Sequence, residues 1–423
     1  MDGAPRVAGL RITACPATVT AVITNGGGRA RAAALMGAGA ALLLVGLNMR
    51  PAVVALSPLL GEVQAATGLS SGAAGALYAV PVLCFGVLAP FAPRIVRRLG
   101  LEGTVCALLV VLLAGIALRL RPSLVPLFVG TFLVGVAVAV ANVAVTTLIK
   151  NDFPDHIALL SGLHSTMLVG GGALAAGLTL PIRDALGLTW PQALAAWGAP
   201  ALVALAVWLP ALRRNRRVES AGDVPVPAAL VWRSALGWNV ALFYGLQSLL
   251  YYTVTGWLPT FYADHGVPPA EAGGLLSVLL VAAIVSSVGT PLLAERPGRQ
   301  GPLAAAGGVL CAASLLGLLL APTAAPALWC VLFGLGIGAA LSLGIQYMAI
   351  RAGGTREAAL LSAMSQCVGY LVALSGPALF GLAFDGTGGW VLGLAGLTVL
   401  VVPMVVTGVI AGRGGEITHR SVA

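Results

Sequence analysis

The sequence contains few charged residues: they make up 9% of its 423 residues, whereas 59% are hydrophobic. Soluble domains need about 25% charged residues to cover their surfaces. The shortage of charge therefore excludes a soluble globular protein. The formal net charge of +9 does not indicate nucleic-acid binding either, because the arginine clusters stand between apolar runs rather than along one soluble face.

Motifs for metal binding and catalysis are also missing. The six cysteines stand singly, without a Cys-x-x-Cys motif or a Cys/His cluster, which argues against disulfides and structural zinc. There is no Walker motif for ATP, and no Lys-Ser/Thr pair follows the glycine run 170–172. No nucleophile–base pair can be assembled from the polar residues, so we expect no enzyme activity, no cofactor and no metal site.

Apolar runs make up most of the chain. About 20 apolar residues cross a bilayer, and twelve runs are of roughly this length, without the period of two that barrel strands show. The predicted spans are residues 33–58, 71–93, 104–119, 122–147, 157–182, 191–211, 234–259, 271–294, 302–321, 325–349, 358–383 and 390–411. The sequence thus predicts an all-α membrane protein with twelve transmembrane helices in the lipid bilayer.

The basic residues predict the orientation, because cytoplasmic connections are rich in Lys and Arg. Apart from Arg50, they fall in the two tails and in alternate connections, and the opposite connections hold only Arg119, Arg121 and Arg183. We therefore expect a plasma-membrane protein with both termini in the cytoplasm, which agrees with an even number of spans. Residues 14–23 are too short and polar for the apolar core of a signal peptide.

The two halves of the chain resemble each other. A shift of 198 residues aligns residues 68–77 with 266–275 and Gly100 with Gly298, and a shift of 201 relates later parts of the halves. Each half holds six spans, so the copies share one orientation, as expected of an alternating-access transporter with a site between two bundles. The predicted parts are a cytoplasmic tail 1–31, a six-helix bundle 32–211, a cytoplasmic linker 212–233, a second bundle 234–411 and a cytoplasmic tail 412–423.

A loop in each half carries a candidate gating motif. The segment 295–299 (ERPGR) resembles the acidic-Arg-x-Gly-Arg motif of the major facilitator superfamily, whose acidic group latches neighbouring helix ends. The first copy has Arg97 at the acidic position, so its latch must be weaker or use another group; the alternative there is a plain positively charged loop. The predicted gating residues are Arg98, Gly100, Glu295, Arg296, Gly298 and Arg299.

Arg50 stands inside the first apolar run, between Met49 and Pro51. A charge at this depth costs about 3 kcal/mol or more and normally faces a cavity or a partner. No carboxylate can be placed beside it, since the acidic residues fall in tails, in connections or at helix ends. Arg50 is therefore the main candidate for binding an anion or a dipole, because a guanidinium donates several directed hydrogen bonds. The alternative is a structural or snorkelling arginine.

Polar side chains on several helix faces complete the candidate site. Tyr244, Gln247 and Tyr251 are spaced by three and four residues and share one face of the seventh span. Tyr252 is adjacent and could point to either side. Such groups line a wet cavity or bond helix to helix, the latter for about 0.6 kcal/mol each. The remaining predicted contacts are Asn48, Asn142, Gln346, Gln366 and Tyr370.

His164 is the only other ionisable side chain that we expect in the membrane. A histidine in this place could relay a proton near neutral pH, or it could be a packing residue. The sequence leaves both interpretations open.

Several stretches together resemble one family closely. Four of them are NMRP at 48–51, LIKNDFPD at 148–155, GLQSL at 245–249 and LSAMSQ at 361–366. Over residues 35–411 the chain is thereby similar to the cyanate and 2-nitroimidazole transporters of the major facilitator superfamily. The resemblance implies a twelve-helix secondary carrier with the first, fourth, seventh and tenth helices around a central path, and it carries the family's arginine over to Arg50.

These features together predict a transporter, secondary active or facilitative, for a small anionic or strongly dipolar solute such as cyanate or a nitroimidazole-like compound. We expect it to act as a monomer and without nucleic acid. One alternative is the efflux of neutral drugs or metabolites, which the tyrosines of the seventh span favour. Another is a membrane receptor or scaffold that transports nothing, against which the lack of a sizeable soluble domain counts.

Overall fold

The computed structural model describes residues 28–88, 91–153, 157–214, 229–294, 298 and 300–417. These residues are helical almost throughout, with one isolated β-bridge between Ala352 and Ile417. Most of the two predicted tails and the central part of the predicted linker lie outside the described residues. Helix α2 begins at Gly28, within the predicted N-terminal tail.

The first membrane crossing consists of four pieces: α2 (Gly28–Met49), α3 (Pro51–Val54), the 3-10 helix η1 (Ser57–Leu59) and α4 (Leu60–Thr67). Proline at positions 51 and 58 removes amide donors, which accounts for the breaks at these points. The crossing therefore extends beyond its predicted end at residue 58. The rest of the first half comprises α5 (Ser71–Leu88), α6 (Ala92–Leu99), α7 (Leu101–Leu118), α8 (Leu124–Asp152), α9 (Ile157–Leu186), α10 (Trp190–Ala196), α11 (Gly198–Trp208) and η4 (Leu209–Arg214).

The second half comprises α12 (Ala229–Trp232), α13 (Ala235–Asp264), α14 (Pro269–Ala294), α15 (Gln300–Leu320), α16 (Pro326–Ile350), α17 (Thr355–Thr387) and α18 (Val391–Gly412). Among the described residues, eleven helical segments are long and apolar enough to cross a membrane, and they coincide with eleven predicted spans. The remaining predicted span is α13, which has the required length of 30 residues. Its lower apolar content follows from the face that carries Tyr244, Gln247 and Tyr251. The predicted all-α fold is confirmed.

Glycines in the left-handed region reveal the internal repeat in the backbone. A positive φ strains any residue with a Cβ, so it favours glycine. The pairs that recur at a shift of 198 are Gly68 (φ 70°) with Gly266 (84°) and Gly100 (76°) with Gly298 (82°), and the pair at a shift of 201 is Gly187 (61°) with Gly388 (67°). The same turns thus recur in both halves at the two shifts that the sequence predicts.

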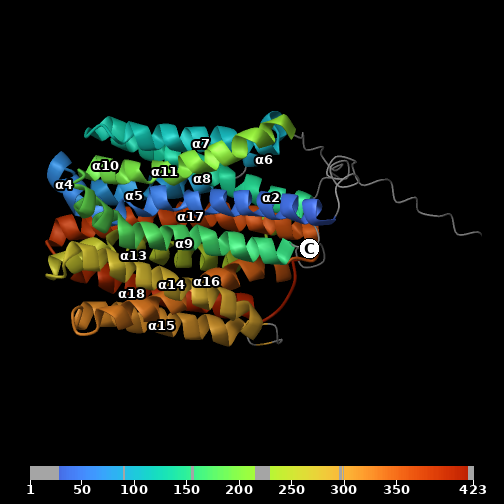
Figure 1. The fold of residues 1–423 in the computed structure, drawn as a ribbon. Coiled ribbons are helices and arrows are strands. Elements are labelled where there is room, and N and C mark those ends of the chain that lie inside the picture. The colour runs from blue at the N-terminus through green and yellow to red at the C-terminus, as the bar shows by residue number, and fades with distance from the viewer. Residues whose placement is uncertain are drawn as a thin grey trace, which may run out of the picture.

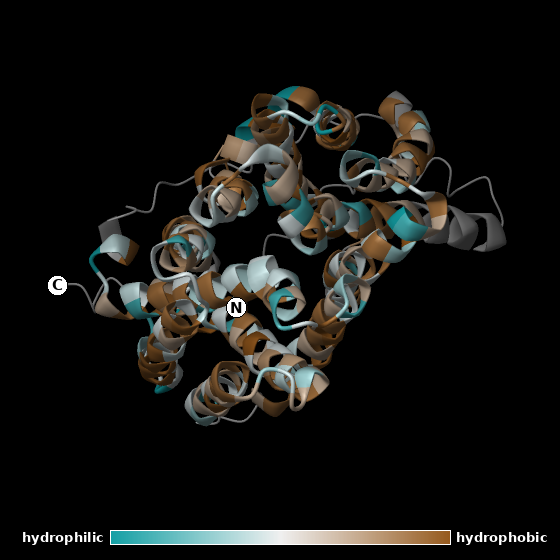
Figure 2. Cartoon of the chain, turned by 90° about the vertical axis from the view of Figure 1, so that its left-hand side faces the viewer, coloured by the Kyte–Doolittle hydropathy of each residue, from teal (hydrophilic) through white to brown (hydrophobic). Residues whose placement is uncertain are grey.

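The long helices lie side by side, with α4 and α10 at one end of the molecule and α6 at the other (Figure 1). We refer to these as the α4 end and the α6 end. Figure 2 looks along the helices from the α4 end and shows hydrophobic segments on all sides. Large apolar side chains in mid-helix, such as Val309 and Val399, are about two-thirds exposed (66% and 67%). Apolar surface of this kind suits a lipid environment.

Hydrogen bonds between the two bundles close the structure on the side of the α4 end. The hydroxyl of Ser57 donates to the carbonyls of Thr255 (2.6 Å) and Gly256 (3.0 Å) on α13. The hydroxyl of Ser277 on α14 donates to the carbonyl of Ala173 on α9 (2.6 Å).

A carboxylate adds a further bond between the bundles at the α4 end. Asp385, near the end of α17, accepts hydrogen bonds from the amides of Ser71 (2.9 Å) and Gly72 (2.7 Å) at the start of α5. All hydrogen bonds that join the bundles within the described part of the chain lie at the level of Arg50 or nearer to the α4 end.

Candidate functional site

A kink in the first crossing positions Arg50. Helix α2 ends at Met49 and α3 begins at Pro51, whose missing amide leaves the carbonyl of Leu47 without its helical donor. Helix α9 packs its backbone against this kink at Gly171, where a Cβ would strike the Leu47 carbonyl and approach Cδ of Pro51 to 3.2 Å. The glycine run of α9 therefore admits the bend from which Arg50 projects.

The guanidinium of Arg50 lies among tyrosines. Nη1 donates to the hydroxyl of Tyr251 (3.3 Å), and Cζ lies 5.6 Å from the ring centroid of Tyr251 and 5.9 Å from that of Tyr252. Cations are attracted to aromatic faces at such distances. No ion pair among the described residues involves Arg50. Because a guanidinium has five N–H donors, most of them are free to bind another group.

Arg50 borders a cavity to which both bundles contribute. The lining residues are Arg50, Val169, Tyr244, Gln247, Ser248, Tyr251, Tyr252, Ala283, Ser287, Ile337, Gly338, Leu341 and Tyr370. The lining has one positive charge and, within the described part of the chain, no carboxylate, so the cavity is suited to a negative or dipolar group.

Aromatic rings from three helices enclose the space beside Arg50. The hydroxyls of Tyr244 and Tyr370 lie 3.0 Å apart, with ring centroids 5.7 Å apart. Phe85 on α5 places its ring 5.5 Å from that of Tyr370 and 6.4 Å from that of Tyr252. Phe85 thus supports two of the lining rings from behind and does not itself line the cavity.

Residues 38–377 match the family model of the Major Facilitator Superfamily. The chain belongs to this superfamily. It is therefore a multi-pass membrane transporter for a small molecule, as the sequence predicts.

Relatives within the superfamily cover most of the chain. The chain is 36% identical over 378 residues to the 2-nitroimidazole transporter of Escherichia coli (strain K12). The aligned region covers 89% of this chain and 96% of that relative. The chain is 29% identical over 366 residues to the cyanate transport protein CynX of the same organism, with coverage of 86% and 94%. An uncharacterized transporter of Bacillus subtilis (strain 168), YycB, is 35% identical over 373 residues, with coverage of 88% and 92%. The resemblance found in the sequence motifs is confirmed.

Solved structures share the fold. A bacterial homologue of the human lysosomal transporter Spinster, inward-facing and unoccupied, superposes with a TM-score of 0.71 at 15% identity and covers 89% of this chain and 96% of that one. A D-xylose–proton symporter gives a TM-score of 0.71 at 13% identity, with coverage of 91% and 99%. The predicted major facilitator fold of two six-helix bundles is thus confirmed.

The cavity brings together five of the predicted contact residues: Arg50, Tyr244, Gln247, Tyr251 and Tyr370. The orientation that the sequence left open is also resolved, because Tyr252 lines the cavity as well. Among the four helices that the superfamily resemblance places around the path, the fourth crossing, α8, contributes no lining residue within the described cavity.

Asn48, another predicted contact, does not line this cavity. Its amide nitrogen donates to the carbonyl of Leu44 (2.7 Å), and it lines a separate, apolar cavity between α2, α7 and α8. Residues two positions apart on a helix point to different sides. Since Arg50 faces the other bundle, Asn48 faces the interior of its own.

Three other predicted contacts lie on the α6 side of the cavity and do not line it: Asn142, Gln346 and Gln366. The amide of Gln366 donates to Ser362 (2.9 Å), one turn before Tyr370 on α17. Gln346 lies about two turns beyond Gly338 on α16. Gln346 and Gln366 thus lie nearer to the α6 end than the residues of α16 and α17 that line the cavity.

His164 packs tightly against the first crossing. Its ring lies next to Gly46: a Cβ added to Gly46 would lie 2.6 Å from Nδ1 of His164. This buried nitrogen has no hydrogen-bond partner within the described residues.

Of the predicted gating residues, Arg98 is exposed on α6, and Gly100 and Gly298 share a positive φ. Glu295, Arg296 and Arg299 lie outside the described residues.

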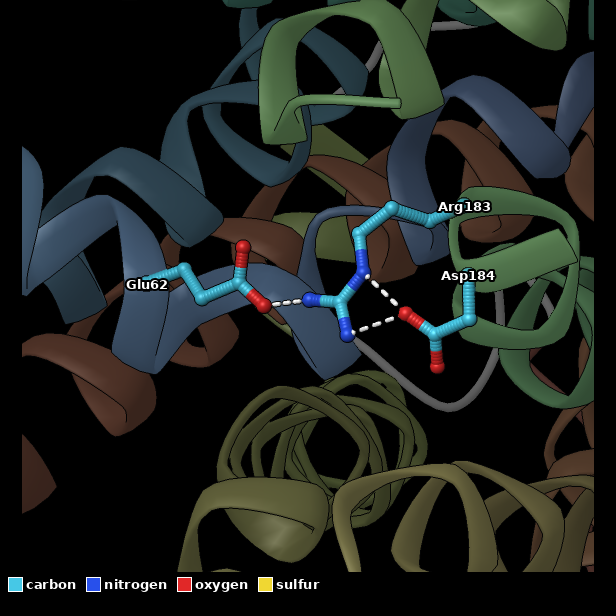
Figure 3. A network of polar contacts seen from close by, with 3 residues as sticks. All are labelled: Glu62, Arg183 and Asp184. Atoms are coloured by element: carbon cyan, nitrogen blue, oxygen red, sulfur yellow. Dashed lines mark hydrogen bonds and ion pairs between the residues drawn. The ribbon is translucent and has the colours of Figure 1, made fainter. Parts of the chain in front are cut away.

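Three arginines assigned to connections by sequence have structural partners instead. Arg183 lies on α9 and pairs with Glu62 on α4 and with the neighbouring Asp184 (2.6 Å; Figure 3). Arg351 is 8% exposed, and its Nε donates to the carbonyl of Ala411 (2.7 Å) in the last turn of α18. Arg119 is buried as well. Charged side chains near helix ends satisfy carbonyls that lack amide donors, which a count of charges per connection cannot detect.

Proposed function

We propose that this transporter carries a small anionic or strongly dipolar solute through the cavity at Arg50. The observation that carries the proposal is a partly buried cation at the cavity with most of its N–H donors free and no carboxylate partner among the described residues. A planar guanidinium suits small planar or linear anions, because its fork donates parallel hydrogen bonds. The names of two relatives, a 2-nitroimidazole transporter and a cyanate transport protein, are consistent with this chemistry.

The surrounding rings add a preference for planar solutes. Tyr244, Tyr252 and Tyr370 offer faces and hydroxyls at the same level as Arg50. A nitroaromatic compound could place its oxygen atoms at the guanidinium and its ring between aromatic side chains. A small linear anion would use the guanidinium and the hydroxyls. The same rings favour the second candidate, efflux of neutral aromatic compounds.

We further propose that the α6 end faces the cytoplasm and that the protein is a plasma-membrane monomer with both termini inside. Exposed arginines at the α6 end, such as Arg97 and Arg98, support the orientation through the preference for positive charge inside.

The driving force follows from charge. Moving one charge through 100 mV is worth about 2.3 kcal/mol, so an inside-negative membrane expels a monovalent anion that moves alone. Since no carboxylate lines the described cavity, we propose export, uniport or exchange, with His164 as the proton relay if import is coupled to protons.

Proteoliposomes test the site and the coupling. Uptake of labelled cyanate and of 2-nitroimidazole is measured for the wild type, Arg50→Lys and Arg50→Ala, with the exposed Arg121→Ala as control. Losing charge-assisted hydrogen bonds should lower kcat/KM by about 10- to 100-fold in Arg50→Ala. Arg50→Lys should recover only part of it, because the fork is lost. Unchanged flux in Arg50→Ala refutes the site, and intravesicular pH during uptake distinguishes proton coupling from uniport.

A further inference from the structure

Arg119 is a buried arginine in the N-terminal bundle. It follows the last residue of α7 and is 1% exposed. Its Nη1 donates to the carbonyl of Ala52 (2.6 Å), two residues beyond Arg50 in the first crossing. Nε and Nη2 are buried and have no hydrogen-bond partner within the described residues. The side chain thus points into the protein, although its helix ends near the surface.

The Ala52 carbonyl needs a donor because the first crossing is broken. Helix α3 ends at Val54, and the following residues form turns and η1. The amide of Ala55 returns to Pro51, but no backbone amide of the described residues outside helix α3 returns to Ala52. A buried carbonyl without a donor is unfavourable, and Arg119 supplies the missing hydrogen bond.

Two glycines make room for this contact. Helices α7 and α8 approach closely at Gly115 and Gly130, where a Cβ on Gly130 would lie 2.6 Å from the Gly115 carbonyl. The same Cβ would lie 2.8 Å from Cγ of Arg119. By contrast, Arg121, two residues later, is exposed. The bundle is therefore packed around the side chain of Arg119 specifically.

The broken segment also contacts the other bundle. Ser57, five residues after Ala52, donates to carbonyls of Thr255 and Gly256 on α13. If the bundles separate at the α4 end during transport, these bonds break, and the short stretch that carries Arg50 needs another attachment to stay in place. The bond from Arg119 is such an attachment, and it lies entirely within the N-terminal bundle.

We propose that Arg119 is a positioning residue that ties the kinked segment to α7 and α8 and thereby holds Arg50 in the cavity. The proposal rests on the proposed role of Arg50. It requires that loss of Arg119 impairs binding through Arg50 while the rate of turnover is kept.

The test uses the full-length protein in proteoliposomes with cyanate and 2-nitroimidazole as probes. Arg119→Met should raise KM about tenfold, as expected for a lost bond from a charged donor, with kcat within about twofold. Arg119→Lys keeps a donor and should restore part of the affinity. Arg121→Met, the matched control, should behave as the wild type. In the double variant with Arg50→Ala, Arg119→Met should have no further effect, because both act through one group.

Three results overturn the proposal: an unchanged KM in Arg119→Met, a loss of kcat alone, or effects of Arg50→Ala and Arg119→Met that multiply in the double variant. If Arg119→Met does not reach the membrane, Arg119→Gln decides by the same criteria, since its shorter side chain cannot span the distance to Ala52.

A measurement without substrate separates this proposal from the proposed function. In a cysteine-free background, Arg50→Cys is labelled with a small methanethiosulfonate reagent. Adding Arg119→Met should accelerate labelling severalfold, because the segment loses its attachment, whereas adding Arg121→Met should not. An unchanged rate overturns the positioning role even if neither probe is transported. Transport that depends on Arg50 but not on Arg119 overturns only the positioning role.

Discussion

Replacing Asp385 with alanine is expected to open the α4 end of the molecule. The carboxylate is exposed, and it accepts hydrogen bonds from the amides of Ser71 (2.9 Å) and Gly72 (2.7 Å) in the first turn of α5. These amides have no acceptor within their own helix. Because Asp385 belongs to the C-terminal bundle and α5 to the N-terminal one, this capping interaction exists only while the two bundles are closed at this end.

The size of the effect follows from the capping geometry. An aspartate that caps a helix N-terminus contributes about 1 kcal/mol, and its charge near the helix dipole adds about 0.3–1 kcal/mol at an exposed position. The loss of about 1–2 kcal/mol would change the ratio of closed to open protein by a factor of about 5–30. Solvent exposure of Asp385 places the expected value at the lower end of this range.

Thiol labelling measures this ratio. Ser57 is fully buried at the contact between the bundles, so a Ser57→Cys thiol in a cysteine-free background reacts with a membrane-impermeant maleimide only after the α4 end opens. The labelling rate is compared with and without Asp385→Ala. Since the open form is the minor one, the rate should rise by about the same factor as the population, roughly fivefold or more.

A carboxylate at the same end of the molecule provides the control. Asp264 accepts a hydrogen bond from Nε1 of Trp390 (3.2 Å), and both residues belong to the C-terminal bundle. Asp264→Ala removes a similar charge without affecting a contact between the bundles, so its labelling rate should stay near that of the parent. Equal labelling rates for Asp385→Ala and the parent protein would show that the capping interaction of Asp385 does not hold the α4 end closed.

Other substitutions test the kink and the outlying contacts. Gly171→Ala should destabilise the purified protein by about 1–3 kcal/mol, seen as a lower Tm, because the added Cβ strikes the kinked backbone. Gly170→Ala is the control and should not lower the Tm, because a Cβ added there meets open space. Equal Tm values for the two variants would contradict this packing. Asn48→Ala should leave KM for cyanate and 2-nitroimidazole unchanged, because the side chain faces away from the cavity; a raised KM in the uptake assay would restore Asn48 to the site. Glu62→Gln should cost less than about 1 kcal/mol in a chemical or thermal denaturation series, because exposed ion pairs contribute little; a larger loss would show that the bridge to Arg183 supports the closed α4 end.

The positions of the membrane crossings could be predicted because hydrocarbon imposes a simple requirement. Every backbone group in lipid must find its partner within its own helix, so length and apolar content are sufficient to find nearly all crossings. The internal repeat was visible for a related reason. Glycine adopts a positive φ without steric cost, and glycine occupies the same turns in both halves, at Gly68 and Gly100 and at their counterparts Gly266 and Gly298. The crossing α13, whose apolar content is lower, was also predicted, over residues 234–259.

The site could be predicted only in part. Arg50 was identifiable because a charge inside an apolar run has few explanations, and the tyrosines of α13 followed from helix periodicity. No local sequence pattern shows at which depth of the membrane a polar side chain lies, or whether it faces the other bundle or the interior of its own. Gln346 and Gln366 have the expected faces but lie nearer to the α6 end, and Asn48 turns into its own bundle. Phe85 packs against Tyr252 and Tyr370 from a helix whose sequence is apolar almost throughout.

The sequence by itself determined the twelve crossings, the repeat, the superfamily and the place of Arg50 within the first crossing, because each of these depends on local composition or on residues close in the chain. Tertiary structure alone decided which polar groups meet Arg50 and what holds it in place. The carbonyl that Arg119 satisfies lies 67 residues away, and the amides that Asp385 caps lie more than 300 residues away. Such contacts arise where broken or ending helices leave backbone groups unpaired, and only the packing of distant helices shows which side chain supplies the missing partner.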